Sequence, residues 1–159
     1  MIEFKEIGVI HSPFAEESGM PIQPAGAKDI KGTVEVFDEY VEGLMHLDGF
    51  SHIILLYYFH RVSEAKLQVV PFLDTRKHGV FATRAPKRPN PLGLSVVKLI
   101  SIEGNKLFIE NVDVIDGTPL IDIKPYVPEF DNVEKIRVGW LEEITQSVQN
   151  KRADARFKK

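Results

Sequence analysis

The sequence predicts a mostly β (α+β) protein, a single β-barrel-like domain with peripheral helices and a non-Rossmann fold. Its 159 residues are the length of one domain, and 43% of them are hydrophobic, which is enough for one core. The apolar segments are short, rich in β-branched and aromatic residues, and bounded by glycine and proline. They do not alternate with long helical patterns, so a parallel βαβ sheet is not predicted.

The first third of the chain predicts two strands, a long loop and a short helix. Residues 4–10 have the pattern of a first strand. Two glycines and two prolines interrupt residues 15–30, which we therefore expect to form a loop; long loops in compact domains are often functional. Polar and apolar side chains alternate along residues 32–37, which is the pattern of a β-strand. Residues 38–47 carry apolar side chains at helical spacing, with Asp38 as the expected N-cap.

The middle of the chain contains its most apolar segment. Residues 53–59 (IILLYYF) are too short for a helix and rich in β-branched and aromatic side chains, which predicts a buried strand. Residues 67–72, interrupted by Pro71, and residues 79–83 are weaker strand candidates. Three prolines then follow within six residues and predict a stiff loop.

The next segments predict a hairpin and a short final strand. Residues 94–102 and 106–115 form two strands joined around Gly104 and Asn105, a sequence typical of hairpin turns. Residues 116–119 (DGTP) form a turn, and residues 120–123 a short strand that prolines terminate.

The C-terminal end predicts a helix from Trp140 to about Lys151, followed by a basic tail. We place the domain boundary near Glu143, where the core pattern ends. Residues 1–143 would form the β-barrel domain, and residues 144–159 the end of the helix and the tail.

Composition excludes several classes of protein. There is no cysteine, which excludes disulfide scaffolds, thiolate metal sites and cysteine nucleophiles. No apolar run reaches the ~18 residues of a membrane span, and the N-terminus lacks the pattern of a secretory signal. The five histidines lack metal-ligand spacing, so no metal site is predicted. We expect a cytoplasmic protein without a membrane partner.

The net charge of −3 conceals a segregation of charge along the chain. Residues 75–102 carry six basic side chains and no acidic one, and residues 151–159 carry a net charge of +4. The remainder is strongly acidic. Such a distribution can present a positive face to phosphate groups, although these residues could also be scattered surface charges.

The basic, proline-rich segment 82–95 is the strongest candidate for a site. Its prolines stiffen the backbone, and Arg84 and Arg88 offer planar groups that suit carboxylate or phosphate. Asn90 can bind a polar ligand edge, and Gly93 permits close backbone approach. The structural alternative is a rigid loop that crosses one end of a barrel.

Three further groups are weaker candidates. The turn at 116–119 could be a plain β-turn, and His60 with Arg61 could serve a structural role at the end of the buried strand. A row of polar side chains follows the turn at two-residue spacing, which places them on one strand face. This face could be a solvated edge or the wall of a polar site. The row consists of Asp122, Lys124 and Tyr126.

Together these segments resemble the TsaA-like family, whose characterised members are the TrmO tRNA methyltransferases. The segment FATRAPKRPNPLGLS at 81–95 is similar to the family's central signature, and DGTPLIDIKPY at 116–126 to its second block. GFSHIILLYYFH at 49–60 resembles the strand that leads to a ligand-binding histidine. The resemblance covers about residues 4–141.

The resemblance implies an S-adenosyl-L-methionine site on a β-barrel, and a homodimer with the cofactor near the subunit interface. It implies methylation of N6 of N6-threonylcarbamoyladenosine beside the anticodon of tRNA, so the expected partner is the tRNA anticodon arm. Without cysteine, radical chemistry with this cofactor is excluded. The implied cofactor contacts are Pro21, Ile22, Gln23, His60, Arg61, Arg84, Leu94, Asp116, Gly117, Thr118 and Pro119.

Methyl transfer needs chiefly alignment of the reacting groups, and the accepting nitrogen must lose a proton. We expect Asp116, or a member of the row with Lys124 and Tyr126, to accept or relay this proton; Asp116 could instead bind only the cofactor. Ala85 and Ile22 depart from the family pattern. Two other functions stay open, a non-catalytic S-adenosylmethionine-binding regulatory or accessory protein and a methyltransferase for another substrate.

Overall fold

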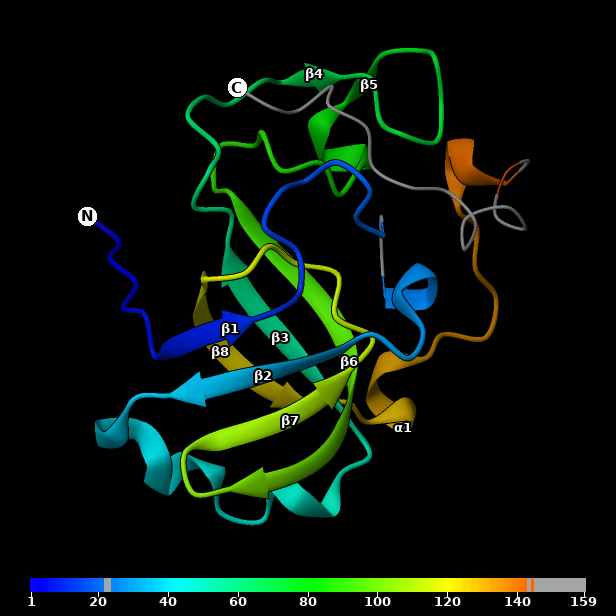
Figure 1. Ribbon diagram of the computed structural model, residues 1–159. Coiled ribbons are helices and arrows are strands. Elements are labelled where there is room, and N and C mark those ends of the chain that lie inside the picture. The colour runs from blue at the N-terminus through cyan, green and yellow to red at the C-terminus, as the bar shows by residue number, and fades with distance from the viewer. Residues whose placement is uncertain (22–23, 143, 145–159) are drawn as a thin grey trace.

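Six antiparallel strands close into a barrel in the computed structural model, which describes residues 1–21, 24–142 and 144. Their order around the barrel is β1-β2-β7-β6-β3-β8 (Figure 1). The mostly β, barrel-like fold class predicted from the sequence is confirmed. The barrel strands are β1 (Gly8–His11), β2 (Lys31–Val36), β3 (His52–Tyr58), β6 (Leu92–Glu103), β7 (Lys106–Glu110) and β8 (Thr118–Pro125).

The barrel core follows from the alternation of side chains along its strands. In β3, Ile53, Leu55 and Tyr57 are buried, while the residues between them are more exposed. The same alternation holds in β6 and β7, so one face of each strand fills the interior. In the barrel wall, β3, the most apolar predicted strand, pairs with β6 on one side and β8 on the other.

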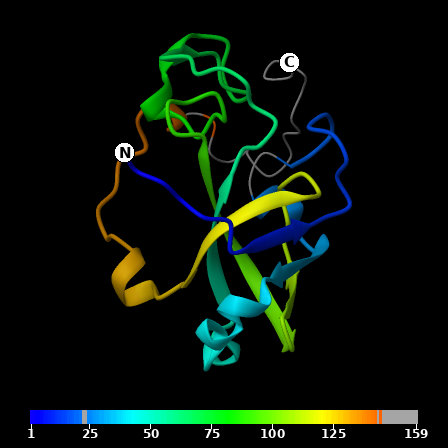
Figure 2. The same cartoon turned by 90° about the vertical axis from the view of Figure 1, so that its left-hand side faces the viewer.

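The two ends of the barrel differ. Two short 3₁₀ helices, η2 (Asp38–Leu44) and η3 (Leu47–Gly49), lie at one end. At the other end stands the segment between β3 and β6, residues 59–91, which we call the β3–β6 insertion (Figure 2). It contains β4 (Gln68–Val69), β5 (His78–Gly79) and η4 (Val80–Ala82), and a small core of its own around Val69 and Val80.

Several predicted elements differ from the structure. Two separate 3₁₀ helices, η2 and η3, stand in place of the single helix expected at 38–47. The chain breaks between them because His46 adopts a left-handed conformation (φ 68°). The strand expected at 79–83 is wrong: β5 ends at Gly79 and η4 follows. The Thr83 backbone amide and hydroxyl both donate to the Val80 carbonyl, which closes a helical turn.

The other strand boundaries shift for local reasons. The first strand begins at Gly8 rather than at residue 4, and the preceding residues are largely exposed. The strand expected at 106–115 ends at Glu110, because Asn111 has a φ of 72°, which breaks the extended backbone. The sequence did not predict the remaining short elements, η1 (Pro24–Ala27) and α1 (Pro128–Asp131).

At the C-terminal end, Gly139–Leu141 forms a single 3₁₀ turn, η5. The rest of the helix predicted to about Lys151, and the basic tail, lie outside the described residues apart from positions 142 and 144. The boundary proposed near Glu143 stays a prediction. No helix in the described part of the chain combines the length and apolar character needed to cross a bilayer.

Candidate functional site: a cavity at the end of the barrel

A cavity of about 660 Å³ lies between the barrel end and the β3–β6 insertion. Tyr57 of β3 and Gly93 of β6 line its floor, and residues of the β3–β6 insertion form much of its wall. The long loop after β1 adds Met20 and Pro21, and residues 113–115 add a further side. Segments far apart in the sequence therefore meet at one end of the fold.

The cavity brings together six of the implied cofactor contacts. They come from the loop after β1, the end of β3, the proline-rich segment, β6 and β8. Ile22 and Gln23 lie outside the described residues. The six that line the cavity are Pro21, His60, Arg61, Arg84, Leu94 and Thr118.

The turn at 116–119 contributes mainly by fixing the loop beside the cavity. Asp116, Gly117 and Pro119 are not among the lining residues. The backbone amides of Asp116 and Gly117 donate to the carbonyls of Phe14 and Ile10, at 2.7 and 2.9 Å. Gly117 has a φ of 84°, so glycine is the residue suited to this turn. The turn thus anchors the start of the long loop to the barrel.

The two arginines of the proline-rich segment have different roles. Arg88 Nη1 donates to the carbonyl oxygens of Thr83 and Ala85, at 2.9 and 3.1 Å, and lies 3.4 Å from that of Val80. Arg88 therefore ties the loop together from within. Arg84 makes no hydrogen bond or ion pair with the described residues, and its side chain lines the cavity. Its guanidinium is the group left for a ligand.

His60 and Arg61 follow β3, and Arg61 reaches the loop after β1. Arg61 Nη1 donates to the Ala15 carbonyl at 2.9 Å, which links the β3–β6 insertion to the loop after β1. Burial, and then the neighbouring Arg61 charge, lower the pKa of His60. His60 is therefore a neutral imidazole at pH 7, able to donate or accept a hydrogen bond.

The sequence did not single out Asp113, which lines the cavity and is partly buried. Ser95 on β6 donates to Asp113 Oδ1 at 2.7 Å, and the buried Tyr57 hydroxyl lies 2.8 Å from Ser95 Oγ. Because the Ser95 proton is used for Asp113, Tyr57 donates to Ser95. One available signal was the polar residue itself, since Asp113 stands between two buried valines in an apolar segment.

Burial strongly raises the pKa values of both Asp113 and Tyr57. Burial raises the pKa of Asp113 to about 7, although the Ser95 hydrogen bond, the Asp113 backbone amide and the Arg84 charge act in the opposite direction. Burial, and then the Asp113 charge, raise the pKa of Tyr57 far above its usual value. Tyr57 therefore stays protonated, whereas Asp113 changes charge near neutral pH.

The residues expected to move a proton lie elsewhere. The Asp116 carboxylate accepts a hydrogen bond from the Ser12 amide at 3.0 Å and lies 3.4 Å from His11 Nδ1. Lys124 pairs with Asp122 at 3.0 Å, and Tyr126 donates to Asn132 at 3.0 Å. None of these predicted catalytic side chains lines the cavity. Their role in proton transfer stays a prediction.

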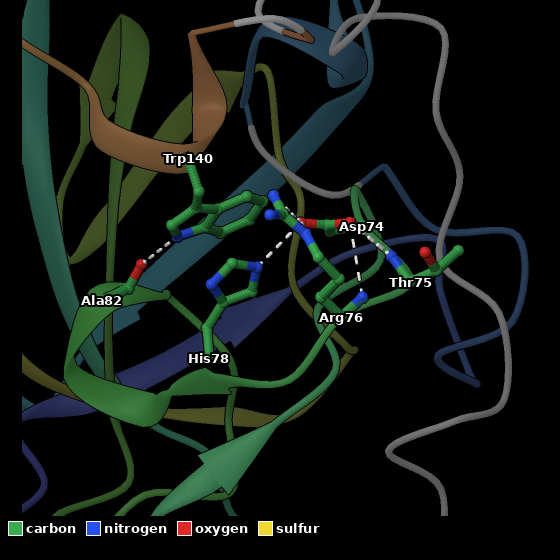
Figure 3. Close-up of polar contacts among 6 residues, drawn as sticks. All are labelled: Asp74, Thr75, Arg76, His78, Ala82 and Trp140. Carbon is green, nitrogen blue, oxygen red and sulfur yellow. Dashed lines mark hydrogen bonds and ion pairs between the residues drawn. The ribbon is translucent and has the colours of Figure 1, made fainter.

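The C-terminal segment closes one side of the cavity through Trp140. Its indole stacks on His78 of β5 with ring centroids 4.4 Å apart, and its Nε1 donates to the Ala82 carbonyl at 2.8 Å (Figure 3). Asp74 accepts from His78 at 2.8 Å and from Arg76 at 3.0 Å, so the imidazole is fixed from both sides. Trp140 and Leu141 both line the cavity.

The side chains of the cavity wall suit an organic ligand that carries a carboxylate. Within the described ranges, no group of three or more histidine, aspartate or glutamate side chains could hold a metal ion. The wall combines the apolar side chains of Phe72 and Leu92 with the Arg84 guanidinium. A ligand with an aromatic ring and a carboxylate matches these groups, and S-adenosylmethionine has both.

The comparisons with known proteins show the family to which the chain belongs. A family model described as the tRNA-methyltransferase O N-terminal domain matches residues 9–132. The chain is 57% identical over 157 residues to a probable S-adenosyl-L-methionine-binding protein of Pyrococcus abyssi, covering 99% of this chain and 85% of that protein. It is 38% identical over 140 residues to the mouse tRNA (adenine(37)-N6)-methyltransferase, covering 83% of this chain and 32% of the enzyme.

Among solved structures, TrmO from Pseudomonas aeruginosa superimposes with a TM-score of 0.74 at 40% identity. The match covers 88% of this chain and 62% of the solved chain, so the chain spans about three fifths of that protein. The residues that the family model matches include nearly all of the barrel strands and the whole β3–β6 insertion. The chain belongs to the TrmO family of β-barrel tRNA methyltransferases, within the TsaA-like proteins.

Proposed function

We propose that this protein transfers a methyl group from S-adenosylmethionine to N6 of adenosine 37, beside the anticodon of tRNA. The proposed acceptor is N6-threonylcarbamoyladenosine. The observation that carries the proposal is the cavity itself, where six expected cofactor contacts from distant segments converge. Family membership, and the name of the mouse relative, support the tRNA substrate.

The cavity residues would divide the work of binding. Arg84 would hold the carboxylate of the methionine moiety, because a guanidinium forms strong charge-assisted bonds with carboxylates. Phe72 and Leu92 would cover the adenine ring. When bound, S-adenosylmethionine supplies a methyl group on a sulfonium centre, which a nucleophile displaces without a metal. The stiff proline loop would keep these groups aligned.

The outer rim suits a nucleic acid. Phe81 lines the cavity mouth and is 75% exposed, so its ring offers a stacking surface for a base. Arg76 and Lys77 are exposed and lie in the segment between Thr75 and Ile102, which carries no acidic residue. These charges would hold phosphate groups of the anticodon arm. We further propose a homodimer that acts in the cytoplasm, on the basis of the family resemblance.

Methyl transfer to tRNA tests the proposal directly. We expect the protein to methylate tRNA that carries threonylcarbamoyladenosine but lacks the methyl group, with one methyl group found on the modified nucleoside by mass spectrometry. Parallel reactions would contain tRNA with unmodified adenosine 37, or no RNA. Methylation of the unmodified tRNA alone would refute the proposed acceptor, and transfer that needs no RNA would indicate another substrate.

A second function is a cofactor-binding protein without catalysis. The Pyrococcus abyssi relative, which matches over 99% of this chain, is named only as a probable S-adenosyl-L-methionine-binding protein. This alternative predicts cofactor binding in calorimetry with no methyl transfer to any tRNA. The same preparation can therefore distinguish the two functions.

A further inference from the structure

Asp113 is one of two carboxyl-bearing residues among the described residues that line the cavity; the other is Glu17, on the loop after β1. Asp113 lies between the buried Val112 and Val114, and Ser95 holds one of its oxygens at 2.7 Å. A fixed, partly buried carboxylate in the cavity wall is placed to contact a bound acceptor, whereas Asp116 hydrogen-bonds the Ser12 amide outside it.

We propose that Asp113 is the general base of the reaction and accepts the proton from N6 of the target adenosine during methyl transfer. This assignment rests on the proposed function. The acceptor nitrogen forms a bond to the methyl carbon, the carbon–sulfur bond breaks, and its electron pair stays on sulfur as a neutral thioether. The N6 proton moves to the Asp113 carboxylate, which afterwards releases it to solvent. No oxidant or further reactant is needed.

Tyr57 and Ser95 act as positioning residues in this proposal. The Tyr57 hydroxyl donates to Ser95, and Ser95 donates to Asp113. Tyr57 keeps its proton because its pKa lies far above the usual value. The chain of hydrogen bonds therefore fixes the carboxylate without competing for the transferred proton.

The acidity of Asp113 fits the role of a base. Burial raises its pKa to about 7, and a base is most effective when its pKa is near the working pH. The other charged or titratable side chains that line the cavity in the described structure are Tyr57, Arg84, Arg61, Arg88, His60 and Glu17. The Arg84 charge lowers the pKa of Asp113, and burial and the Arg61 charge lower the pKa of His60.

Asp113→Asn tests the proposal, because asparagine keeps the shape and an oxygen that can accept from Ser95. In the wild type, kcat/KM should rise as pH rises towards about 7 and then level off, since only the carboxylate accepts a proton. In the variant, we expect kcat to fall about 100-fold or more. The rise of kcat/KM from acid to neutral pH, which we call the acid limb, should disappear. The affinity for S-adenosylmethionine, measured by calorimetry, should change less than about threefold.

The folded protein provides a second readout that does not depend on activity. The Asp113 pKa is higher in the folded than in the unfolded chain, so charging this group destabilises the fold as pH rises from about 4 to about 7. Asparagine stays uncharged, so the Asp113→Asn variant does not lose this folding stability as the pH rises. We therefore expect the variant to melt at a higher temperature than the wild type at pH 8, and the difference to shrink towards pH 4.

Three further variants complete the design. Asp48→Asn changes an exposed carboxylate on η3, at the barrel end away from the cavity, and should retain full activity. His60→Gln should keep the acid limb if Asp113 causes it. Asp116→Asn tests Asp116, the first candidate base expected from the sequence.

The outcomes separate this proposal from the proposed function. A wild-type protein that methylates no tRNA overturns both. If the wild type is active and Asp113→Asn keeps its kcat and acid limb, Asp113 is not the base and the function stands. A variant that loses cofactor affinity but recovers wild-type kcat at saturation also overturns the assignment, because Asp113 is then only a cofactor ligand. If the acid limb is lost in Asp116→Asn or His60→Gln but kept in Asp113→Asn, the assignment of Asp113 as the base is overturned as well.

Discussion

Replacing Gly93 with alanine is expected to destabilise the protein by about 2 kcal/mol and to abolish methyl transfer. A Cβ atom at Gly93 would lie 2.6 Å from Cζ of Tyr57 and 2.8 Å from Cζ of Phe59. These rings pack edge to face, and Tyr57 is buried and hydrogen-bonded to Ser95. Neither ring can move without disturbing the floor of the cavity and the position of Asp113.

Urea denaturation and the tRNA methylation assay measure the two effects. Gly43→Ala is the matched control, because Gly43 lies in η2 with no atom within 4 Å of an added Cβ. This control should be neutral or slightly stabilising. A Gly93→Ala protein with wild-type stability and activity would show that the cavity floor adapts freely, contrary to the rigid network described above.

Replacing Arg84 with alanine should weaken S-adenosylmethionine binding by about 10- to 100-fold, the loss expected for one hydrogen bond to a charged group. Arg84 has no hydrogen bond within the described structure to lose, so the stability of the fold should hardly change. The same change should move the acid limb to higher pH, because the Arg84 charge lowers the pKa of Asp113. Calorimetry and a pH–rate profile measure both effects.

Arg76→Ala is the control for Arg84→Ala. Arg76 pairs with Asp74 at 3.0 Å, is largely exposed and does not line the cavity. Its loss should leave cofactor affinity unchanged, although tRNA binding could weaken with the lost charge. Equal cofactor affinities for the Arg84 variant and the wild type would contradict the assignment of the carboxylate to this guanidinium.

The sequence was sufficient to predict the barrel and the segments that surround the cavity. Short apolar runs ended by glycine or proline predicted the barrel strands, and the residues 53–59 correspond closely to β3. The proline-rich segment and His60 were expected at a site and do line the cavity. Such local patterns are reliable because side-chain alternation and proline geometry act over a few residues.

The sequence did not identify Asp113 because its position depends on a local break in the strand. Residues 106–115 read as one continuous strand, in which Asp113 would be an ordinary polar position. The left-handed Asn111 ends β7 before it, and Asp113 then contacts Ser95 of β6, 18 residues away in the sequence. A contact between separate segments leaves no periodic signal in either of them.

The different roles of Arg84 and Arg88 were also beyond the reach of the sequence. Both arginines lie in one basic loop, and residue type gave them the same expected chemistry. The fold directs Arg88 towards three carbonyl groups of its own loop and leaves Arg84 at the cavity. Prolines lack an amide donor, so a side chain has to satisfy carbonyl groups in such a loop.

A crystal structure of the protein with S-adenosylhomocysteine and an anticodon stem-loop would test most directly that this cavity is the methyl-transfer site. The account predicts the carboxylate of the ligand on Arg84, its sulfur inside the cavity, and N6 of the target adenosine within ~3 Å of the Asp113 carboxyl group. A ligand bound beside Asp122 and Lys124, with none in the cavity, would contradict the account.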